Sequence, residues 1–144
     1  MFRILLAEDN PGDVLLFREA LRGSRLSFEI VVAEDGDEAM AFLEDVADTP
    51  AGGVADLIVL DVNLPKHSGD EVLRKIRGRA SLADVPVIML TSSVSPEDKA
   101  RSMKLGANLY LQKSSNIEQL FEIGRIVERM LERKGASYPE AASD

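Results

Sequence analysis

The central stretch of the chain reads Asp56-Leu57-Ile58-Val59-Leu60-Asp61-Val62-Asn63-Leu64-Pro65. Its apolar run, residues 57–60, is short, nearly continuous and followed at once by an acid. A run of this kind indicates a strand that is buried on both faces of a parallel sheet, because a strand with one face in water would alternate. Similar runs lie at 4–7, 30–33 and 87–90, and a weaker one at 109–111.

Helical patterns separate these runs. In the first three intervening segments apolar residues recur on one face at helical spacing, as Val72 and Ile76 do. Asn10 and Ser95, each directly before a proline, are typical helix caps. Strands that alternate with helices predict an α/β fold, a doubly wound parallel sheet of five strands with five helices and right-handed crossovers.

Length and composition predict one domain. A chain of 144 residues, 45% of them hydrophobic, can bury one sizeable core and does not have the composition of a disordered protein. We expect the domain to span residues 1–134 and a flexible tail, rich in Ala, Ser, Pro and Glu, to span 135–144. Residues 49–54 form the most loop-like interior stretch, between the second helix and the third strand.

Charge and residue content argue against two classes of partner. The net charge is −8, whereas affinity for nucleic acid needs clustered Lys and Arg. No apolar run approaches the ~20 residues that span a membrane, and the N-terminus carries no recognisable export signal. The chain also has no cysteine. We therefore expect a cytoplasmic protein that binds neither nucleic acid nor membrane.

Polar side chains follow four of the five predicted strands. Glu8 and Asp9 follow the first strand, Asp61 the third, Thr91 the fourth and Lys113 the fifth. The carboxyl ends of parallel strands meet at one edge of a sheet, where ligands usually bind, so these side chains are expected to converge. Taken singly, each has an ordinary interpretation as a solvated loop residue. The joint pattern is what favours a site.

This group of residues is suited to phosphoryl transfer. Three carboxylates at one edge would repel one another unless a cation lay between them. Mg²⁺ suits best, because it accepts a few carboxylates and completes its octahedron with water and phosphate oxygens. A lysine and a threonine beside it would hold phosphoryl oxygens. The candidate nucleophile is the carboxylate of Asp61, since the chain offers no cysteine.

In combination these residues resemble the receiver domain of two-component response regulators. The matching pieces are residues 6–10, the central stretch with Gly69, residues 86–91 and residues 106–113, and the resemblance covers 1–134. It implies a flavodoxin-like receiver fold with strand order 2-1-3-4-5. It also implies a sensor histidine kinase as the phosphoryl donor, and a chain that catalyses only its own phosphorylation and dephosphorylation.

The resemblance assigns a role to each matching residue. Asp61 would be the phosphoacceptor, Thr91 would follow the phosphoryl group, and Lys113 would pair with it. Tyr110 falls at the switch position, where an aromatic ring turns inward when the threonine moves. The Mg²⁺ ligands that the family implies are Asp9, Asp61, the backbone carbonyl of Asn63 and, mainly through water, Glu8.

One position departs from the family pattern. The family usually has a proline, joined by a cis bond, after the lysine, whereas Ser114 follows Lys113 here. A cis bond before another residue costs ~2.5–4 kcal/mol, so either the site holds that strain or the loop is trans. Residues 9–13 together with Lys113-Ser114 resemble the stand-alone regulators that partner bacterial phytochrome histidine kinases, which signal by protein contacts or phosphorelay.

The last predicted helix, from about Asn116 to Lys134, has two apolar stripes. One is expected to pack on the sheet and comprises Ile117, Leu120, Phe121, Gly124, Val127 and Leu131. The other comprises Ile123, Ile126 and Met130. A helix at the edge of a sheet needs only one stripe, so we expect the second to bind the same helix of another subunit in a two-fold dimer. The alternative is that neighbouring helices bury part of it.

Two other functions use related chemistry. A phosphatase of the haloacid dehalogenase kind also has an Asp nucleophile, but it needs a second Asp two residues later, where this chain has Asn63. A nucleotide or flavin binder on the same fold would need a Gly-rich phosphate loop after the first strand, and the sequence has none.

Overall fold

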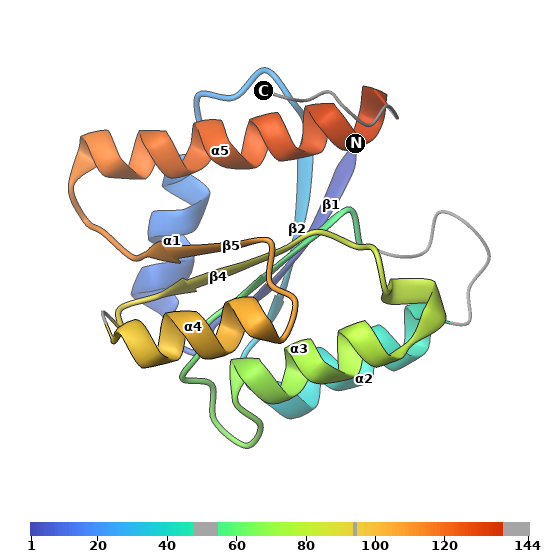
Figure 1. Cartoon of the computed structure of the whole chain (residues 1–144). Helices are drawn as coiled ribbons and strands as arrows, with labels where there is room; N and C mark the ends of the chain where they lie inside the picture. The colour runs from blue at the N-terminus through green and yellow to red at the C-terminus, as the bar shows by residue number, and fades with distance from the viewer. Residues whose placement is uncertain (48–54, 94, 137–144) are drawn as a thin grey trace.

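Five parallel strands form one sheet at the centre of the molecule (Figure 1). The structure is a computed structural model and describes residues 1–47, 55–93 and 95–136. The strands are β1 (Phe2–Ala7), β2 (Phe28–Ala33), β3 (Leu57–Leu60), β4 (Val87–Thr91) and β5 (Leu109–Gln112). Their order is β2-β1-β3-β4-β5, which confirms the predicted fold.

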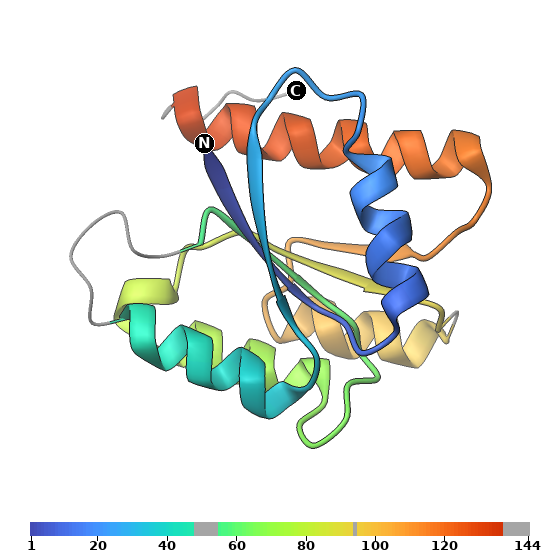
Figure 2. The same cartoon turned by 180° about the vertical axis from the view of Figure 1, so that it is seen from behind.

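Helices cover both faces of the sheet (Figures 1 and 2). They are α1 (Pro11–Ala20), α2 (Gly36–Ala47), α3 (Gly69–Gly78), α4 (Pro96–Lys104) and α5 (Ile117–Ala136), with a short 3₁₀ turn at Ala80–Leu82. α1 and α5 lie together on one face, and α2, α3 and α4 lie on the other. The crossover connections therefore use both faces, as in a doubly wound sheet.

Side-chain caps set the starts of the helices that follow the strands. The Oδ1 atom of Asn10 accepts hydrogen bonds from the backbone N–H of Gly12 (2.8 Å) and Asp13 (3.1 Å). Ser68 and Glu71 form a reciprocal capping box at α3. These bonds satisfy backbone donors that the first turn of a helix would otherwise leave unpaired. They also fix where each helix begins relative to the strand end before it.

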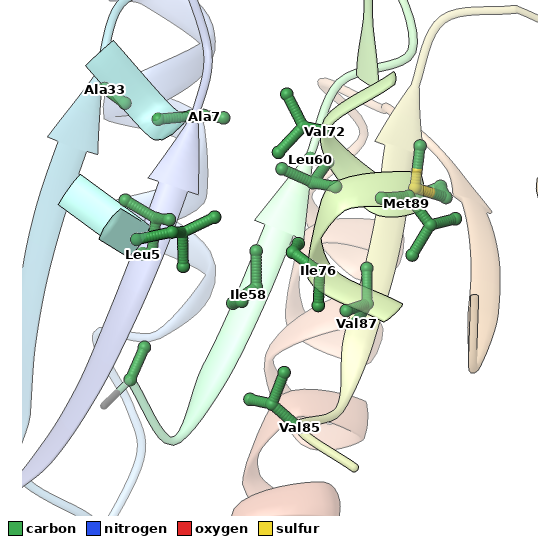
Figure 3. Close-up of a cluster of buried hydrophobic side chains, with 14 of the residues drawn as sticks. Leu5, Ala7, Ala33, Ile58, Leu60, Val72, Ile76, Val85, Val87 and Met89 are labelled. Carbon is green, nitrogen blue, oxygen red and sulfur yellow. The ribbon is translucent and has the colours of Figure 1, made fainter. Parts of the chain in front are cut away.

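Each of the inner strands buries side chains on both faces, which yields two cores. Along β1, Leu5 and Ala7 point to the α2–α3 side, and Ile4 and Leu6 point to the α1–α5 side, as the period of two requires. Figure 3 shows the first core, where strand side chains meet α3; it includes Leu5, Ile58, Leu60, Val72, Ile76, Val87 and Met89.

The edge strands are less buried than their apolar runs predict. In β2 only Ala33 is fully buried, and β5 is partly buried along Leu109–Leu111. An edge strand has one neighbouring strand instead of two. Its outer side is therefore covered only where a helix reaches it, and part of it stays open to solvent. The prediction of burial on both faces is confirmed for β3 and β4 and is wrong for β2 and β5.

The predicted division of α5 into two stripes is wrong. Ile123 is only 7% exposed and belongs to the core under α1 and α5, whereas Ile117 and Phe121 are 60% and 43% exposed. The buried stripe is instead Leu120, Ile123, Gly124, Val127 and Leu131. Gly124 lies in this stripe, where a side chain would collide with the backbone carbonyl of Ala20 in α1. The alternative that neighbouring helices bury part of the second stripe holds for Ile123.

Two predicted irregular segments lie outside the described residues, the loop 49–54 wholly and the tail 135–144 from residue 137 onward. α5 runs to Ala136, so it extends two residues past the predicted domain boundary at 134. Within the described ranges, no helix combines the length and the apolar character that a membrane crossing needs.

Candidate functional site

The backbone of the sheet continues past the strand ends and fixes the predicted site residues. The N–H of Asp61 donates to the carbonyl of Ala7 (3.1 Å), and the N–H of Lys113 donates to the carbonyl of Thr91 (2.8 Å). The N–H of Glu8 likewise bonds to the end of β2 at 2.9 Å. Because these bonds prolong the parallel ladders, the side chains of neighbouring strands emerge side by side at the carboxyl edge.

Three carboxylates meet at this edge. Glu8, Asp9 and Asp61 each place one oxygen within 4.8 Å of the others, as the topology predicts. Glu8 is 4% exposed and Asp61 is 6% exposed, whereas Asp9 is exposed to solvent. A compact set of carboxylate oxygens with an open side suits a hard divalent cation that keeps several water ligands.

Lys113 lies in the middle of the acidic group. Its Nζ atom is 2.7 Å from Glu8 Oε1, 2.7 Å from Asp61 Oδ2 and 2.8 Å from Asp13 Oδ2. Burial alone lowers the pKa of the ammonium, but the hydrogen bonds to Asp13, Asp61 and Glu8 outweigh it and raise that pKa above its ordinary value. Lys113 is therefore a fixed positive charge directly against Asp61.

Both carboxylate oxygens of Asp61 have a donor. Oδ2 accepts from Lys113, and Oδ1 accepts the backbone N–H of Asn63 at 3.0 Å. The loop that carries Asn63 thus folds back on Asp61 through its main chain, while Asn63 itself is exposed. Charge-assisted bonds of this kind hold one rotamer of the carboxylate, which orients it for attack on an incoming group.

Glu8, like Asp61, has a donor at each of its carboxylate oxygens. Its Oε2 atom accepts the N–H of Asn10 at 3.1 Å, and its Oε1 atom accepts from Lys113. Burial raises the pKa of the Glu8 carboxyl, and the bonds to Lys113 and Asn10 offset part of that rise. A cation beside the Glu8 carboxyl would favour its ionised form.

Thr91 and Tyr110 are joined through the loop after β4. Thr91 is fully buried, and its Oγ1 atom accepts the N–H of Ser93 at 3.3 Å. The hydroxyl of Tyr110 donates to the carbonyl of the same Ser93 at 3.5 Å, and its ring packs against the first core. Within the described chain, the Thr91 hydroxyl has no hydrogen bond to Asp61 or Lys113.

Ser114 begins a capped turn. No peptide bond is cis in the part of the chain that the structure describes, so the Lys113–Ser114 bond is trans. The Ser114 hydroxyl accepts the N–H of Asn116 (2.9 Å), and Asn116 Oδ1 accepts the N–H of Glu118 (3.0 Å) at the start of α5. The serine thus contributes to the turn through its side chain, which a proline could not do.

The sequence prediction missed Asp13. This residue lies in the first turn of α1, five positions after Glu8, and it supplies the third partner of Lys113. The available signal was an acidic residue in the first turn of a helix that follows a strand with site residues at its end. Such acids are common, because their negative charge interacts favourably with the helix dipole.

The family model of the response regulator receiver domain matches residues 4–125. The chain belongs to this family. Nothing in these comparisons supports the haloacid dehalogenase alternative.

Curated and solved relatives agree with this assignment. Response regulator Rcp1 of Synechocystis sp. is 39% identical over 125 residues, which are 87% of this chain and 85% of Rcp1. The phosphorylated cyanobacterial phytochrome response regulator RcpA matches with a TM-score of 0.81 and 39% identity, over 96% of this chain and 99% of RcpA. The Mn²⁺-bound form of response regulator Rcp1 matches with a TM-score of 0.77 and 35% identity, over 99% and 98%.

Proposed function

We propose that this response regulator accepts a phosphoryl group on Asp61 from a sensor histidine kinase. The observation that carries the proposal is the position of Asp61, a buried carboxylate within the acidic group and bonded to Lys113 at 2.7 Å. One Asp61 oxygen attacks phosphorus as the bond from phosphorus to the kinase histidine nitrogen breaks. The chain's own task in this step is to orient the carboxylate and to balance charge.

We propose Mg²⁺ as the metal of this site. Glu8, Asp9 and Asp61 are the carboxylates that would hold it, with the backbone carbonyl of Asn63 completing the set that the family implies. When bound, the ion would neutralise negative charge on the phosphoryl oxygens and on the acids. The Mn²⁺-bound form of Rcp1 supports a divalent cation here, since Mg²⁺ and Mn²⁺ both prefer oxygen ligands.

The residues around Asp61 have separate tasks in the proposal. Lys113 donates to a phosphoryl oxygen after transfer, in place of the anionic Asp61 oxygen. Thr91 then exchanges its bond with the loop N–H of Ser93 for a bond to the phosphoryl group. Because Ser93 also accepts from Tyr110, a shift of this loop changes the surroundings of the ring. The Thr91–Tyr110 pair is the proposed switch.

The proposed partner is a kinase of the phytochrome type. RcpA is a cyanobacterial phytochrome response regulator, and its likeness to this chain extends over 96% of the residues. Output would run through protein contacts or phosphorelay. The chain would catalyse only its own phosphorylation and dephosphorylation, in the cytoplasm, where a kinase that uses ATP finds its nucleotide.

We also propose that α5 joins two copies of the chain. Of the stripe predicted from the sequence, Ile123 is excluded by its burial, and Met130 packs partly on the core. Ile126 is partly exposed, and Ile117 and Phe121 are exposed on the same helix. The substitution Ile126→Glu should convert a dimer to a monomer in sedimentation experiments, and a wild-type chain that is monomeric at high concentration would refute the dimer.

The phosphoacceptor is tested with acetyl phosphate and Mg²⁺. The wild type should acquire one phosphoryl group in an adduct that is stable to acid and labile to base, as an acyl phosphate is. Asp61→Asn should acquire none, with circular dichroism confirming that it folds. No adduct on the wild type, or the same adduct on Asp61→Asn, would refute the proposal.

A further inference from the structure

Asp13 contacts Lys113 but has no task in the phosphoryl transfer proposed above. Its Oδ2 atom lies 2.8 Å from Lys113 Nζ, across 100 positions of sequence. The Asp13 side chain is 30% exposed and that of Lys113 is 16% exposed, so the pair is partly shielded from water. A charge-assisted bond in such a place is stronger than one on an open surface.

The geometry accounts for every proton of the ammonium. An ammonium group has three N–H donors, and Lys113 directs them at Glu8, Asp13 and Asp61. Among the described residues, the acids that could share a cation are Glu8, Asp9 and Asp61, and Asp13 is not in that group. Asp13 therefore contacts the lysine without belonging to the candidate metal-binding group.

Glu8 and Asp13 are anchored to the same turn. The N–H of Asn10 holds Glu8, and the side chain of Asn10 holds the N–H of Asp13 at the start of α1. Two carboxylates on one capped turn thus fix two of the three N–H groups of Lys113. The third N–H is left to point at Asp61.

We propose that Asp13 is a positioning residue for phosphoryl transfer, which with Glu8 holds Lys113 so that one N–H faces Asp61 and its phosphoryl group. This inference rests on the proposed function of Asp61. Transfer converts the anionic Asp61 oxygen into part of an acyl phosphate, which makes it a weaker acceptor. Asp13 and Glu8 keep their charges and hold the ammonium where the new phosphoryl oxygen needs it.

An opposing effect makes the proposal testable. The Asp13 carboxylate also adds negative charge near an incoming phosphoryl group, which repels it. Positioning predicts that loss of Asp13 slows transfer, whereas repulsion predicts that the loss speeds it. Asp13→Ala removes both the charge and the acceptor, and Asp13→Asn removes the charge but keeps an acceptor oxygen.

The experiment compares initial rates of adduct formation with acetyl phosphate at saturating Mg²⁺. Asp13→Ala should be slower by about three- to tenfold, which is the range expected for a partly exposed charged hydrogen bond. Asp13→Asn should fall between it and the wild type. Glu118→Ala is the matched control, because it removes an exposed first-turn acid of α5 that is not among the partners of Lys113. Its rate should equal that of the wild type.

Two further measurements separate positioning from a structural effect. The Mg²⁺ concentration that gives half the maximal rate should stay within about twofold in Asp13→Ala, since the metal ligands are intact. In a Lys113→Ala background, Asp13→Ala should cause no additional loss, because its effect passes through the lysine.

The outcomes separate a failure of the positioning role of Asp13 from a failure of the proposed function of Asp61. A wild-type or faster rate in both Asp13 variants would overturn the positioning role and leave Asp61 as the phosphoacceptor. An undiminished effect of Asp13→Ala in the Lys113→Ala background would also overturn it. A wild type that forms no adduct at all would overturn the function of Asp61 and, with it, this inference.

Discussion

A single methyl group added at Gly69 should displace Asp61, the proposed phosphoacceptor. Gly69 is the first residue of α3, and its N–H donates to the carbonyl of Val62 at 3.0 Å. A Cβ at this position would lie 2.9 Å from the carbonyl carbon of Asp61 and closer still to its oxygen. Because those atoms are backbone, Gly69→Ala requires α3 or the end of β3 to move.

The size of the effect follows from two opposing terms. Overpacking against fixed atoms costs about 1–3 kcal/mol. Replacing glycine by alanine stabilises by about 0.4–1 kcal/mol, because the unfolded chain loses freedom. We expect a net destabilisation of about 1–2 kcal/mol, or a melting temperature lower by about 3–7 °C.

Gly78→Ala is the matched control, since Gly78 ends the same helix and a Cβ at that position would meet nothing within 4 Å beyond its chain neighbours and the helix's own backbone. It should be neutral or stabilising by up to about 1 kcal/mol. Urea unfolding followed by circular dichroism measures both variants, and acetyl phosphate labelling of the folded Gly69→Ala protein should be slower. Equal stability of the two variants, with an unchanged labelling rate, would refute the close packing of α3 on Asp61.

Two other predictions test the packing of α5 and the metal. Ile123→Ala should lower the free energy of unfolding in urea by about 2–4 kcal/mol, because the Ile123 side chain is only 7% exposed. Phe121→Ala should lower it by much less, because Phe121 is 43% exposed. Equal losses in the two variants would contradict the burial pattern of α5. Removal of divalent ions with EDTA should abolish labelling by acetyl phosphate, and added Mg²⁺ should restore it; labelling that persists in EDTA would contradict a metal-dependent site.

The sequence predicts the fold well because its strands are short apolar runs. Leu57–Leu60 and Val87–Thr91 are buried on both faces and could be recognised from hydrophobicity alone. Once strands and helices alternate, parallel topology brings the residues after each strand to one edge. For that reason the convergence of Glu8, Asp61 and Lys113 follows from sequence without any side-chain geometry.

What the sequence could not predict depends on the direction of individual helices. The period of a helix groups residues into stripes, but the packing of neighbouring helices decides which stripe faces the core. Gly124 lets α5 approach Ala20 of α1 closely, and in this packing Ile123 is buried. The contact of Asp13 with Lys113 likewise depends on the angle at which α1 leaves β1, which no local pattern specifies.

The central claim is that Asp61 carries the phosphoryl group, and reductive trapping tests it most directly. Borohydride converts an aspartyl phosphate to homoserine, which peptide mass spectrometry locates in the sequence. After treatment with acetyl phosphate and Mg²⁺, homoserine should replace Asp61 and no other acid. Homoserine at Asp9 or Asp13, or none at position 61 in a protein that is labelled, would contradict the assignment.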